Sequence, residues 1–234
     1  MFYITGDTHR NFDRVYNFCK NNNTSKDDVM IILGDAGINF LTQRADGYKD
    51  TLLKAKLEDT LPITLFCVHG NHEQRPSEIS SYEEIEFNGG IVYREKDFPS
   101  LLFGKDGEIY DFNGKQVMVI GGAYSIDKYY RLAFGFPYFY NEQPSKEIKE
   151  YVEEKLEGLN YRVDYILSHT APLKFEPTDI FSESIDQTNI DKTTEKWLDK
   201  IEDKLSYEKW YCGHYHIDRD ERKLHFRYNT IHEL

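Results

Sequence analysis

Apolar runs alternate along this chain with segments whose apolar residues recur every three or four positions. Short buried strands are predicted by the apolar runs at residues 1–4, 29–33, 63–68 and 165–167. Amphipathic helices are predicted by helical spacing of apolar residues at 12–20, 48–57 and 193–205. Strands that alternate with helices are typical of an α/β domain, in which crossover helices connect the strands.

The middle of the chain has a different pattern. Short β-like runs occur at residues 90–93, 101–103, 108–112 and 116–121. Asn113-Gly114, between the last two runs, is a strong signal for a hairpin turn. We therefore expect a second sheet of antiparallel strands packed against the first. Residues 127–142 are rich in Tyr and Phe, which predicts a loop or cap insertion at about 124–145. We expect these aromatic side chains mainly to pack together, with stacking on a base as the alternative.

The size and composition of the chain add the expected context. A length of 234 residues, 39% hydrophobic and 30% charged, predicts one folded domain over residues 1–234. The apolar runs are too short to span a bilayer, and the N-terminus has no basic region or cleavage site of a signal peptide. Three cysteines without disulfide-like spacing fit a reducing compartment, so we expect a cytoplasmic protein.

The net charge of −12 restricts the partners that the chain can bind. Binding long duplex nucleic acid requires clustered Lys and Arg, whereas the Lys residues here are interleaved with Glu and Asp, as at residues 146–157. The sequence gives no sign of duplex DNA binding. A small phosphorylated substrate, a nucleotide or a short nucleic acid remains compatible with this charge.

Candidate chemistry lies in five short stretches that combine Gly or Ser with Asp, Asn or His, four of them directly after an apolar run. They are Gly6-Asp7-Thr8-His9, Gly34-Asp35-Ala36-Gly37, Gly70-Asn71-His72-Glu73, Ser168-His169-Thr170 and Gly213-His214-Tyr215-His216. In an open α/β sheet, functional residues gather at the carboxyl ends of strands. Carboxylate, amide and imidazole ligands suit divalent ions such as Mn²⁺, Fe²⁺, Zn²⁺ or Ni²⁺. Together the stretches carry enough ligands for two metal ions.

Each stretch alone has an ordinary explanation, since Gly-Asp and Gly-Asn pairs are common in turns and a lone His usually packs or lies on the surface. The five in this order, however, resemble the calcineurin-like metallophosphoesterase superfamily over residues 3–216. The small bacterial and phage members are the most similar in length and in the Gly-Asn-His-Glu motif. The resemblance implies an α/β fold of four layers, in which two mixed sheets pack together and helices flank them.

The resemblance also implies roles for individual residues. One metal would be held by Asp7, His9 and His216, the second by Asn71, His169 and His214, with Asp35 bridging the two and His72 as the catalytic histidine. We expect the metals to be Mn²⁺, with Fe, Zn or Ni as alternatives. A water that bridges two such ions loses its proton and attacks phosphorus as hydroxide. His72 would protonate the leaving group as general acid.

Substrate choice is less defined by the sequence. The residues after Asp35 lack the Asp-Arg-Gly run of the Ser/Thr protein phosphatases, which disfavours that activity. Arg10 and Arg131 are candidates for binding a phosphate, although a structural ion pair is the more common role for such residues. We expect hydrolysis of a phosphodiester or phosphomonoester. The alternatives are a nuclease or cyclic-nucleotide phosphodiesterase, and, from a different class, a binding scaffold without turnover.

Overall fold

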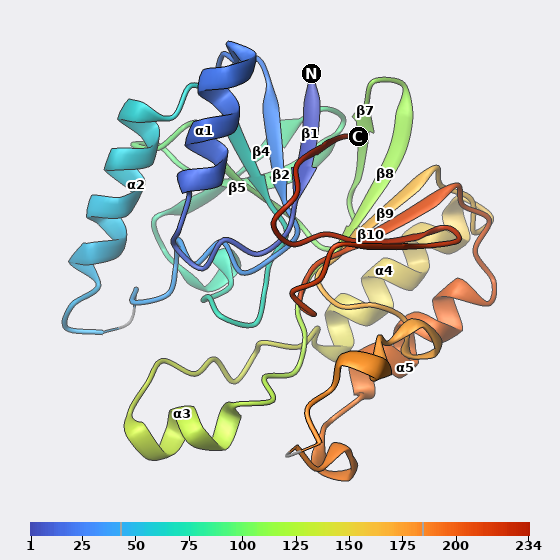
Figure 1. The fold of residues 1–234 in the computed structure, drawn as a ribbon. Helices are drawn as coiled ribbons and strands as arrows, with labels where there is room; N and C mark the ends of the chain where they lie inside the picture. Colours follow the sequence, from blue (N-terminus) through green and yellow to red (C-terminus); the bar gives the residue numbers. More distant parts are fainter. Residues whose placement is uncertain (43, 184) are drawn as a thin grey trace.

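The computed structural model describes residues 1–42, 44–183 and 185–234, and its strands form two mixed sheets (Figure 1). The first sheet has seven strands in the order β13-β1-β2-β3-β6-β5-β4. Its strands are β1 (Phe2–Thr5), β2 (Val29–Ile32), β3 (Thr64–Cys67), β4 (Tyr82–Phe87), β5 (Gly90–Glu95), β6 (Leu101–Gly104) and β13 (His232–Glu233). Strands β1, β2, β3 and β6 run parallel to one another. β13 and β5 pair antiparallel with β1 and β6, and β4 pairs antiparallel with β5.

The second sheet has six strands in the order β11-β12-β10-β9-β8-β7. They are β7 (Ile109–Phe112), β8 (Lys115–Ile120), β9 (Tyr165–Ser168), β10 (Lys209–Cys212), β11 (Arg219–Glu221) and β12 (Leu224–Phe226). Its four middle strands run parallel, and β7 and β11 close the two edges antiparallel.

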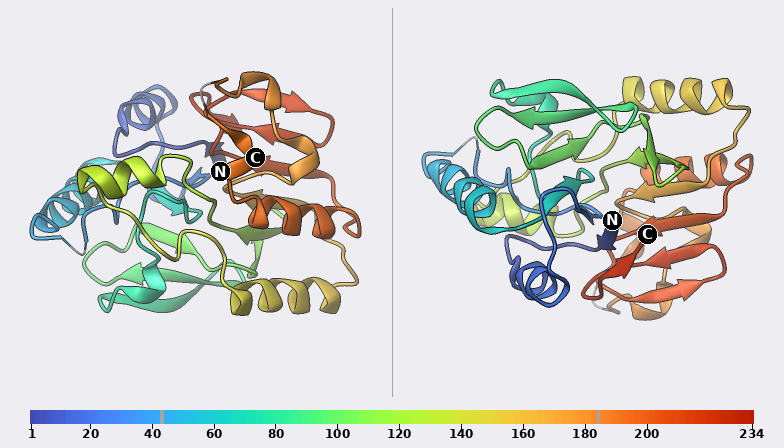
Figure 2. Two further views of the ribbon diagram at one scale, coloured as in Figure 1. Left: turned by 90° about the horizontal axis from the view of Figure 1, so that it is seen from below. Right: turned by 90° about the horizontal axis from the view of Figure 1, so that it is seen from above.

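Helices cover the outer faces of the two sheets, which gives the four layers that the resemblance implies, whereas α3 (Lys128–Phe134) lies beyond the sheets (Figures 1 and 2). The helices are α1 (Asp13–Asn22), α2 (Tyr48–Thr60), α3 (Lys128–Phe134), α4 (Lys146–Gly158) and α5 (Thr193–Glu202). Short 3-10 turns lie at Pro76–Glu78, Leu173–Phe175, Thr178–Ile180 and Gln187–Asn189. Helices α1 and α2 lie on the first sheet, and α4 and α5 lie on the second.

The alternation of side chains along each strand explains this layering. In β2, Met30 and Ile32 pack under α1 and α2, while Ile31 faces the second sheet. In β9, Ile166 packs under α4 and α5, while Leu167 faces the first sheet. All of these side chains are fully buried, because strands covered on both faces have no polar side.

The sequence predictions of the individual elements are confirmed with shifts of a few residues at their ends, but the division into sheets differs. Strands β5 and β6, expected in a second antiparallel sheet, instead extend the first sheet through the pairing of β6 with β3. The second sheet is mainly parallel. The hairpin at Asn113-Gly114 is confirmed, with both residues at positive φ (57° and 80°), as a two-residue hairpin turn of this kind requires.

The segment at 124–145 consists of α3 and irregular stretches on both sides of it. Its aromatic side chains contact one another, as expected: the Tyr130 ring lies 4.6 Å from Phe134 and 5.8 Å from Phe136 between centroids, and Tyr138 lies 5.1 Å from Tyr140. The segment nevertheless exposes much of its aromatic surface, at Tyr129, Tyr130, Phe134, Phe136 and Tyr140. In Figure 1 this segment and the chain before α5 both extend past the sheets on the side where β1 ends. Among the described residues, no helix has the length and apolar character needed to cross a membrane.

Candidate metal centre

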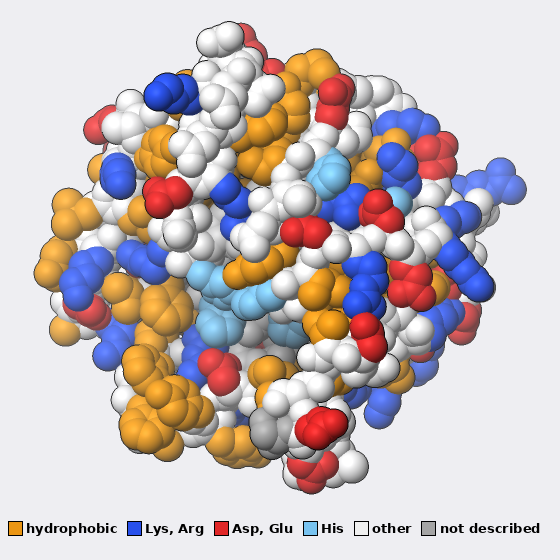
Figure 3. Space-filling view, viewed as in Figure 1, with side chains coloured by type: hydrophobic (Ala, Val, Ile, Leu, Met, Phe, Trp, Pro, Cys, Tyr) orange, Lys and Arg blue, Asp and Glu red, His pale blue; other side chains and the backbone are white. Residues whose placement is uncertain are grey.

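The five motif stretches lie together because they follow strands that end at the same edge. Strands β1, β2 and β3 are parallel neighbours, and so are β9 and β10 in the facing sheet. The residue after each strand therefore emerges at the carboxyl edge of the two-sheet sandwich. Figure 3 shows histidine side chains gathered beside a hollow near the centre of the view.

Glycine residues make this convergence possible. A Cβ atom added at Gly34 would lie 2.0 Å from Nδ1 of His169, and one at Gly70 would lie 2.0 Å from Oδ1 of Asp35. Any side chain at these two positions would therefore displace a candidate ligand. The Gly that precedes Asp35 and the Gly that precedes Asn71 are required by close packing.

Four of the candidate ligands have a left-handed backbone conformation, which is uncommon for residues other than Gly. The φ angles are 45° for His9, 49° for Asp35, 65° for His214 and 52° for His216. Such conformations are unfavourable for residues with a side chain and are concentrated at functional sites. Here they turn side chains from successive loops toward a common point.

Asp7 forms the centre of a first group of ligand atoms with His9 and His216. Its Oδ2 atom lies 3.2 Å from Nε2 of His216 and 3.7 Å from Nε2 of His9, and the two Nε2 atoms are 2.9 Å apart. Oδ1 of Asp7 accepts a hydrogen bond from the His214 backbone N–H. Burial alone would raise the pKa of Asp7, but the His216 hydrogen bond and the nearby imidazoles outweigh it and hold that pKa well below its usual value.

Asp35 lies between this group and a second one. Its Oδ1 atom lies 3.6 Å from Nε2 of His169, and its Oδ2 atom lies 4.0 Å from Nε2 of His9. Oδ2 of Asp35 also lies 4.0 Å from Nε2 of His72. The backbone N–H of His72 donates to Oδ1 of Asp35 at 2.7 Å. Asp35 is only 2% exposed. A carboxylate in this position is within reach of both groups.

Asn71 and His169 face each other in an arrangement that favours a cation between them. Nδ1 of His169 lies 2.8 Å from the carbonyl oxygen of Leu33, which only accepts, so Nδ1 carries a proton and Nε2 is the nitrogen available to a metal. Nε2 lies 2.8 Å from Oδ1 of Asn71, which is also an acceptor. When Nε2 carries no proton, both atoms are acceptors, and a cation bound by both removes their repulsion. The donor set therefore fits a divalent metal.

The orientation of Asn71 is fixed by residues that the sequence reasoning did not single out as site residues. Ser125 donates its hydroxyl proton to Oε2 of Glu142 at 2.5 Å, so its oxygen must accept from Nδ2 of Asn71 at 2.9 Å. Nδ2 is thereby directed away from the centre and Oδ1 toward His169. All three residues are buried. Both Ser125 and Glu142 belong to the 121–145 stretch, which was notable in the sequence but had no assigned role.

His214 and His72 complete the set of motif side chains at this edge. The rings of His214 and His169 have centroids 4.9 Å apart, and desolvation lowers the pKa of His214 to about 3, so its imidazole is neutral and has a free lone pair. Desolvation also lowers the pKa of His72. His214 and His72 line the same cavity as Asp35 and Asn71.

The two candidate phosphate-binding arginines lie in different surroundings. Arg10 donates to Oδ1 of Asp50 at 2.5 Å and to the carbonyl oxygen of Gly37 at 2.8 Å, which ties the loop after β1 to α2. Arg131 is 3% exposed and donates to Oγ of Ser125 at 3.2 Å. Arg131 thus contacts the residue that orients Asn71, while Arg10 is engaged in a structural ion pair.

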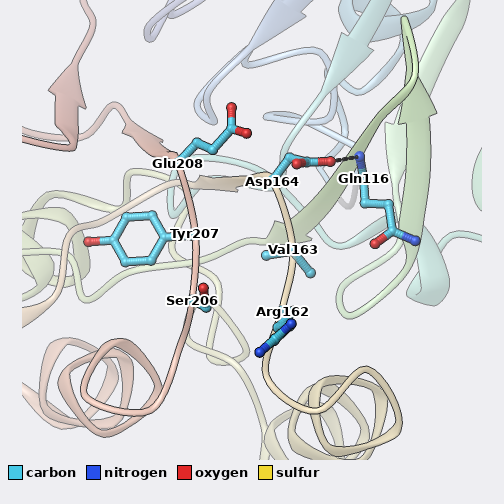
Figure 4. Close-up of a pocket in the computed structure, with 7 residues that line it drawn as sticks. All are labelled: Gln116, Arg162, Val163, Asp164, Ser206, Tyr207 and Glu208. Atoms are coloured by element: carbon cyan, nitrogen blue, oxygen red, sulfur yellow. Dashed lines mark hydrogen bonds between the residues drawn. The ribbon is translucent and has the colours of Figure 1, made fainter.

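A different cavity, of about 240 Å³, lies at the opposite edge of the second sheet (Figure 4). Its lining includes Asp164 and Glu208, which directly precede β9 and β10, and Oδ2 of Asp164 accepts from the Gln116 backbone N–H at 2.7 Å. The described residues that line it include no histidine. This cavity therefore adds no imidazole ligand to those at the carboxyl edge of the strands.

Comparison with known proteins agrees with this geometry. The family model of calcineurin-like phosphoesterases matches residues 1–227, and the chain belongs to that family. Its members are metal-dependent phosphoesterases. No curated protein matches the chain. One solved crystal structure is similar with 14% sequence identity and a TM-score of 0.48, covering 98% of this chain and 88% of the other.

The Ser125 contact leads to a first prediction. Replacing Ser125 with Ala removes the acceptor for Nδ2 of Asn71 and leaves the amide free to rotate, so we expect divalent metal affinity to fall by about 10- to 100-fold. Calorimetric titration of metal-stripped protein with Mn²⁺ measures this. Ser125→Thr should retain most of the affinity, and Ser80→Ala, at an exposed position, should retain all of it. Unchanged affinity in Ser125→Ala would contradict the orienting role.

Proposed function

We propose that this protein hydrolyses phosphoesters with the help of two divalent ions. Asp7, His9 and His216 would hold one ion, Asn71, His169 and His214 the other, and Asp35 both. The observation that carries this proposal is the pair of facing acceptors, Nε2 of His169 and Oδ1 of Asn71, at 2.8 Å beside the two buried carboxylates. Such a cluster is unfavourable without cations and suits two metals well.

When bound, the two ions supply a water of lowered pKa at neutral pH and positive charge that neutralises the phosphoryl oxygens. The protein contributes fixed ligand positions. Asp7 is held by the His214 N–H, Asp35 by the His72 N–H, and Asn71 by Ser125. Because these contacts exist before substrate binds, no reorganisation is needed during the reaction.

His72 is proposed to donate a proton to the leaving oxygen. Its ring lines the cavity and its Nε2 atom lies 4.0 Å from Oδ2 of Asp35, so a carboxylate faces the imidazole. That carboxylate favours the protonated form, in opposition to the desolvation that lowers the pKa of His72. A positioned general acid of this kind typically contributes about 10²- to 10⁴-fold to the rate.

The shape of the site is compatible with both phosphodiesters and phosphomonoesters. A cavity of about 470 Å³ borders the centre at Asp35 and His72, and another of about 450 Å³ borders it at Asp7. Since His9 lines both, a phosphorus atom at the centre has space for organic groups on two sides. This favours a diester, and it supports a nuclease or cyclic-nucleotide phosphodiesterase as the second candidate.

The test is hydrolysis by metal-stripped protein of bis-p-nitrophenyl phosphate and p-nitrophenyl phosphate, with and without added Mn²⁺, Fe²⁺, Zn²⁺ or Ni²⁺. We expect turnover that depends on the metal, and the preferred ester separates diesterase from monoesterase activity. Failure to hydrolyse either ester while two metals are bound would contradict the proposal and favour a binding scaffold.

A further inference from the structure

The larger cavity beside the candidate metal centre extends well past the ligand residues. Its volume of about 470 Å³ is within the range of pockets that enclose small organic ligands. One wall is formed by the centre, and the others come from residues 124–127 and from the chain at 180–195. In Figure 3 a hollow adjoins the histidines on this side. This space is available to the organic part of a substrate.

The walls of the cavity are largely apolar and aromatic. They include Tyr124, Ile126, Ile180, Phe181, Ile190 and Tyr215. The rings of Phe181 and Tyr215 are nearly parallel, with an interplanar angle of 15° and centroids 6.2 Å apart. Ile126 and Ile180 are 53% and 42% exposed, which is unfavourable in water unless a ligand covers them. These walls favour a flat, weakly polar group.

The charged residues around the cavity restrict the ligand further. Asp127, Asp191 and Glu195 contribute carboxylates to its lining. Lys192 is the one Lys or Arg among the described lining residues, and its Nζ atom is paired with Oε1 of Glu176 at 2.8 Å. Additional phosphate groups would be repelled here. The organic group therefore carries no negative charge.

Glu195 supplies a specific polar feature in this apolar surrounding. It is 3% exposed, and its Oε1 atom accepts from the Thr170 hydroxyl at 2.9 Å. Because the single Thr170 proton is used there, the Tyr215 hydroxyl donates to Thr170 at 3.0 Å. The other oxygen, Oε2, has no hydrogen-bond partner among the described residues. Buried polar atoms are almost always hydrogen-bonded. Oε2 of Glu195 is therefore an acceptor whose donor is not among the described residues.

We propose that the cavity binds a nucleobase, a neutral planar nitrogen heterocycle, and that Oε2 of Glu195 accepts a hydrogen bond from a ring N–H. This inference rests on the proposed phosphoesterase function and identifies the substrate class as nucleotide esters. Phe181 stacks on Tyr215, and Nζ of Lys192 lies over the Phe181 ring, 5.1 Å from its centroid. A base that stacks on Phe181 therefore displaces this ammonium. Burial raises the pKa of Glu195 to about 7, and a hydrogen bond from a ring N–H to Oε2 would favour the ionised carboxylate.

The test compares three p-nitrophenyl esters with the same leaving group. They are thymidine 5′-(p-nitrophenyl phosphate), its N3-methyl derivative, which lacks the ring N–H, and methyl p-nitrophenyl phosphate, which lacks the base. For the wild-type protein with Mn²⁺, we expect kcat/KM to be at least about tenfold higher for the thymidine ester than for either of the others.

Two variants connect this preference to the cavity. In Glu195→Gln the acceptor oxygen is replaced by an amide N–H₂, which cannot accept from the ring N–H. The ratio of kcat/KM for the thymidine ester to that for the N3-methyl ester should therefore fall to about one. Phe181→Ala should reduce kcat/KM for the thymidine ester far more than for the methyl ester, and it tests the cavity independently if Glu195→Gln does not fold. Glu183→Gln, an exposed carboxylate of the same segment, should leave all three values unchanged.

The outcomes separate the two proposals. Equal kcat/KM for the three esters in the wild-type protein would overturn the nucleobase site while leaving the phosphoesterase intact. An N3-methyl ester as good as the thymidine ester would overturn the Glu195 contact. Absence of metal-dependent hydrolysis of all three, methyl p-nitrophenyl phosphate included, would instead overturn the proposed function.

Discussion

Asp35→Asn is expected to lower kcat for metal-dependent phosphoester hydrolysis by at least about 10³-fold. Its carboxylate lies between the two groups of candidate ligands, 3.6 Å from His169 and 4.0 Å from His9. The Asn side chain keeps an Oδ1 atom that accepts from the His72 N–H, so the change removes the charge and one oxygen ligand while the loop remains tied. Turnover with bis-p-nitrophenyl phosphate and metal content by atomic emission measure the two effects.

The matched control for this substitution is Asp97→Asn, at an exposed position outside the site. It should keep both full activity and two metals per chain. Wild-type turnover in Asp35→Asn would show that this carboxylate does not connect the two ions, and the ligand assignment would then have to be abandoned.

His72→Ala is expected to have an effect that depends on the leaving group. With a poorly leaving alkoxide the rate should fall by about 10²- to 10⁴-fold, because the departing oxygen then needs the proton. With p-nitrophenolate, which leaves without a proton, the loss should be small. The measurement is kcat for a series of aryl and alkyl esters. A plot of log kcat against the pKa of the leaving alcohol should have a steeper slope for His72→Ala than for the wild-type protein.

The metal content of His72→Ala distinguishes an acid from a ligand. Nε2 of His72 is as far from Asp35 as Nε2 of His9 is, so the distances alone allow both roles. Two metals retained, together with the steeper slope, support the general acid. Loss of a metal with an equal decrease for every ester would make His72 a ligand. His232→Ala, at an exposed position on the edge strand, serves as the control.

The candidate site was predictable from the sequence to the extent that its residues directly follow strands. A short apolar run followed by Gly and Asp or Asn specifies both a buried strand and the edge at which the polar residues emerge. Asp7, Asp35 and Asn71 lie near one another because their strands are parallel neighbours, and the alternation of strands and helices along the chain favours this pairing. The Gly residues are part of the same signal because ligands pack against them.

Other features depend on contacts that a local pattern does not specify. The apolar pattern of β5 and β6 is equally suited to either sheet, and the pairing of β6 with β3 decides it. The contact of Ser125 with Asn71 spans 54 positions. In the sequence Glu195 is one of many charged residues in predicted helices. Only its burial beside Thr170 and the apolar cavity distinguishes it from the others.

The left-handed backbone at His9, Asp35, His214 and His216 has an evolutionary consequence. Each such residue costs about 1–3 kcal/mol relative to a relaxed conformation, so these four candidate ligands lower the free energy of unfolding. Asn and Gly adopt this conformation most easily. Selection for stability alone would therefore replace these four residues with Asn or Gly, and chains of this family that have lost turnover should become more stable at the same positions where they lose their ligands.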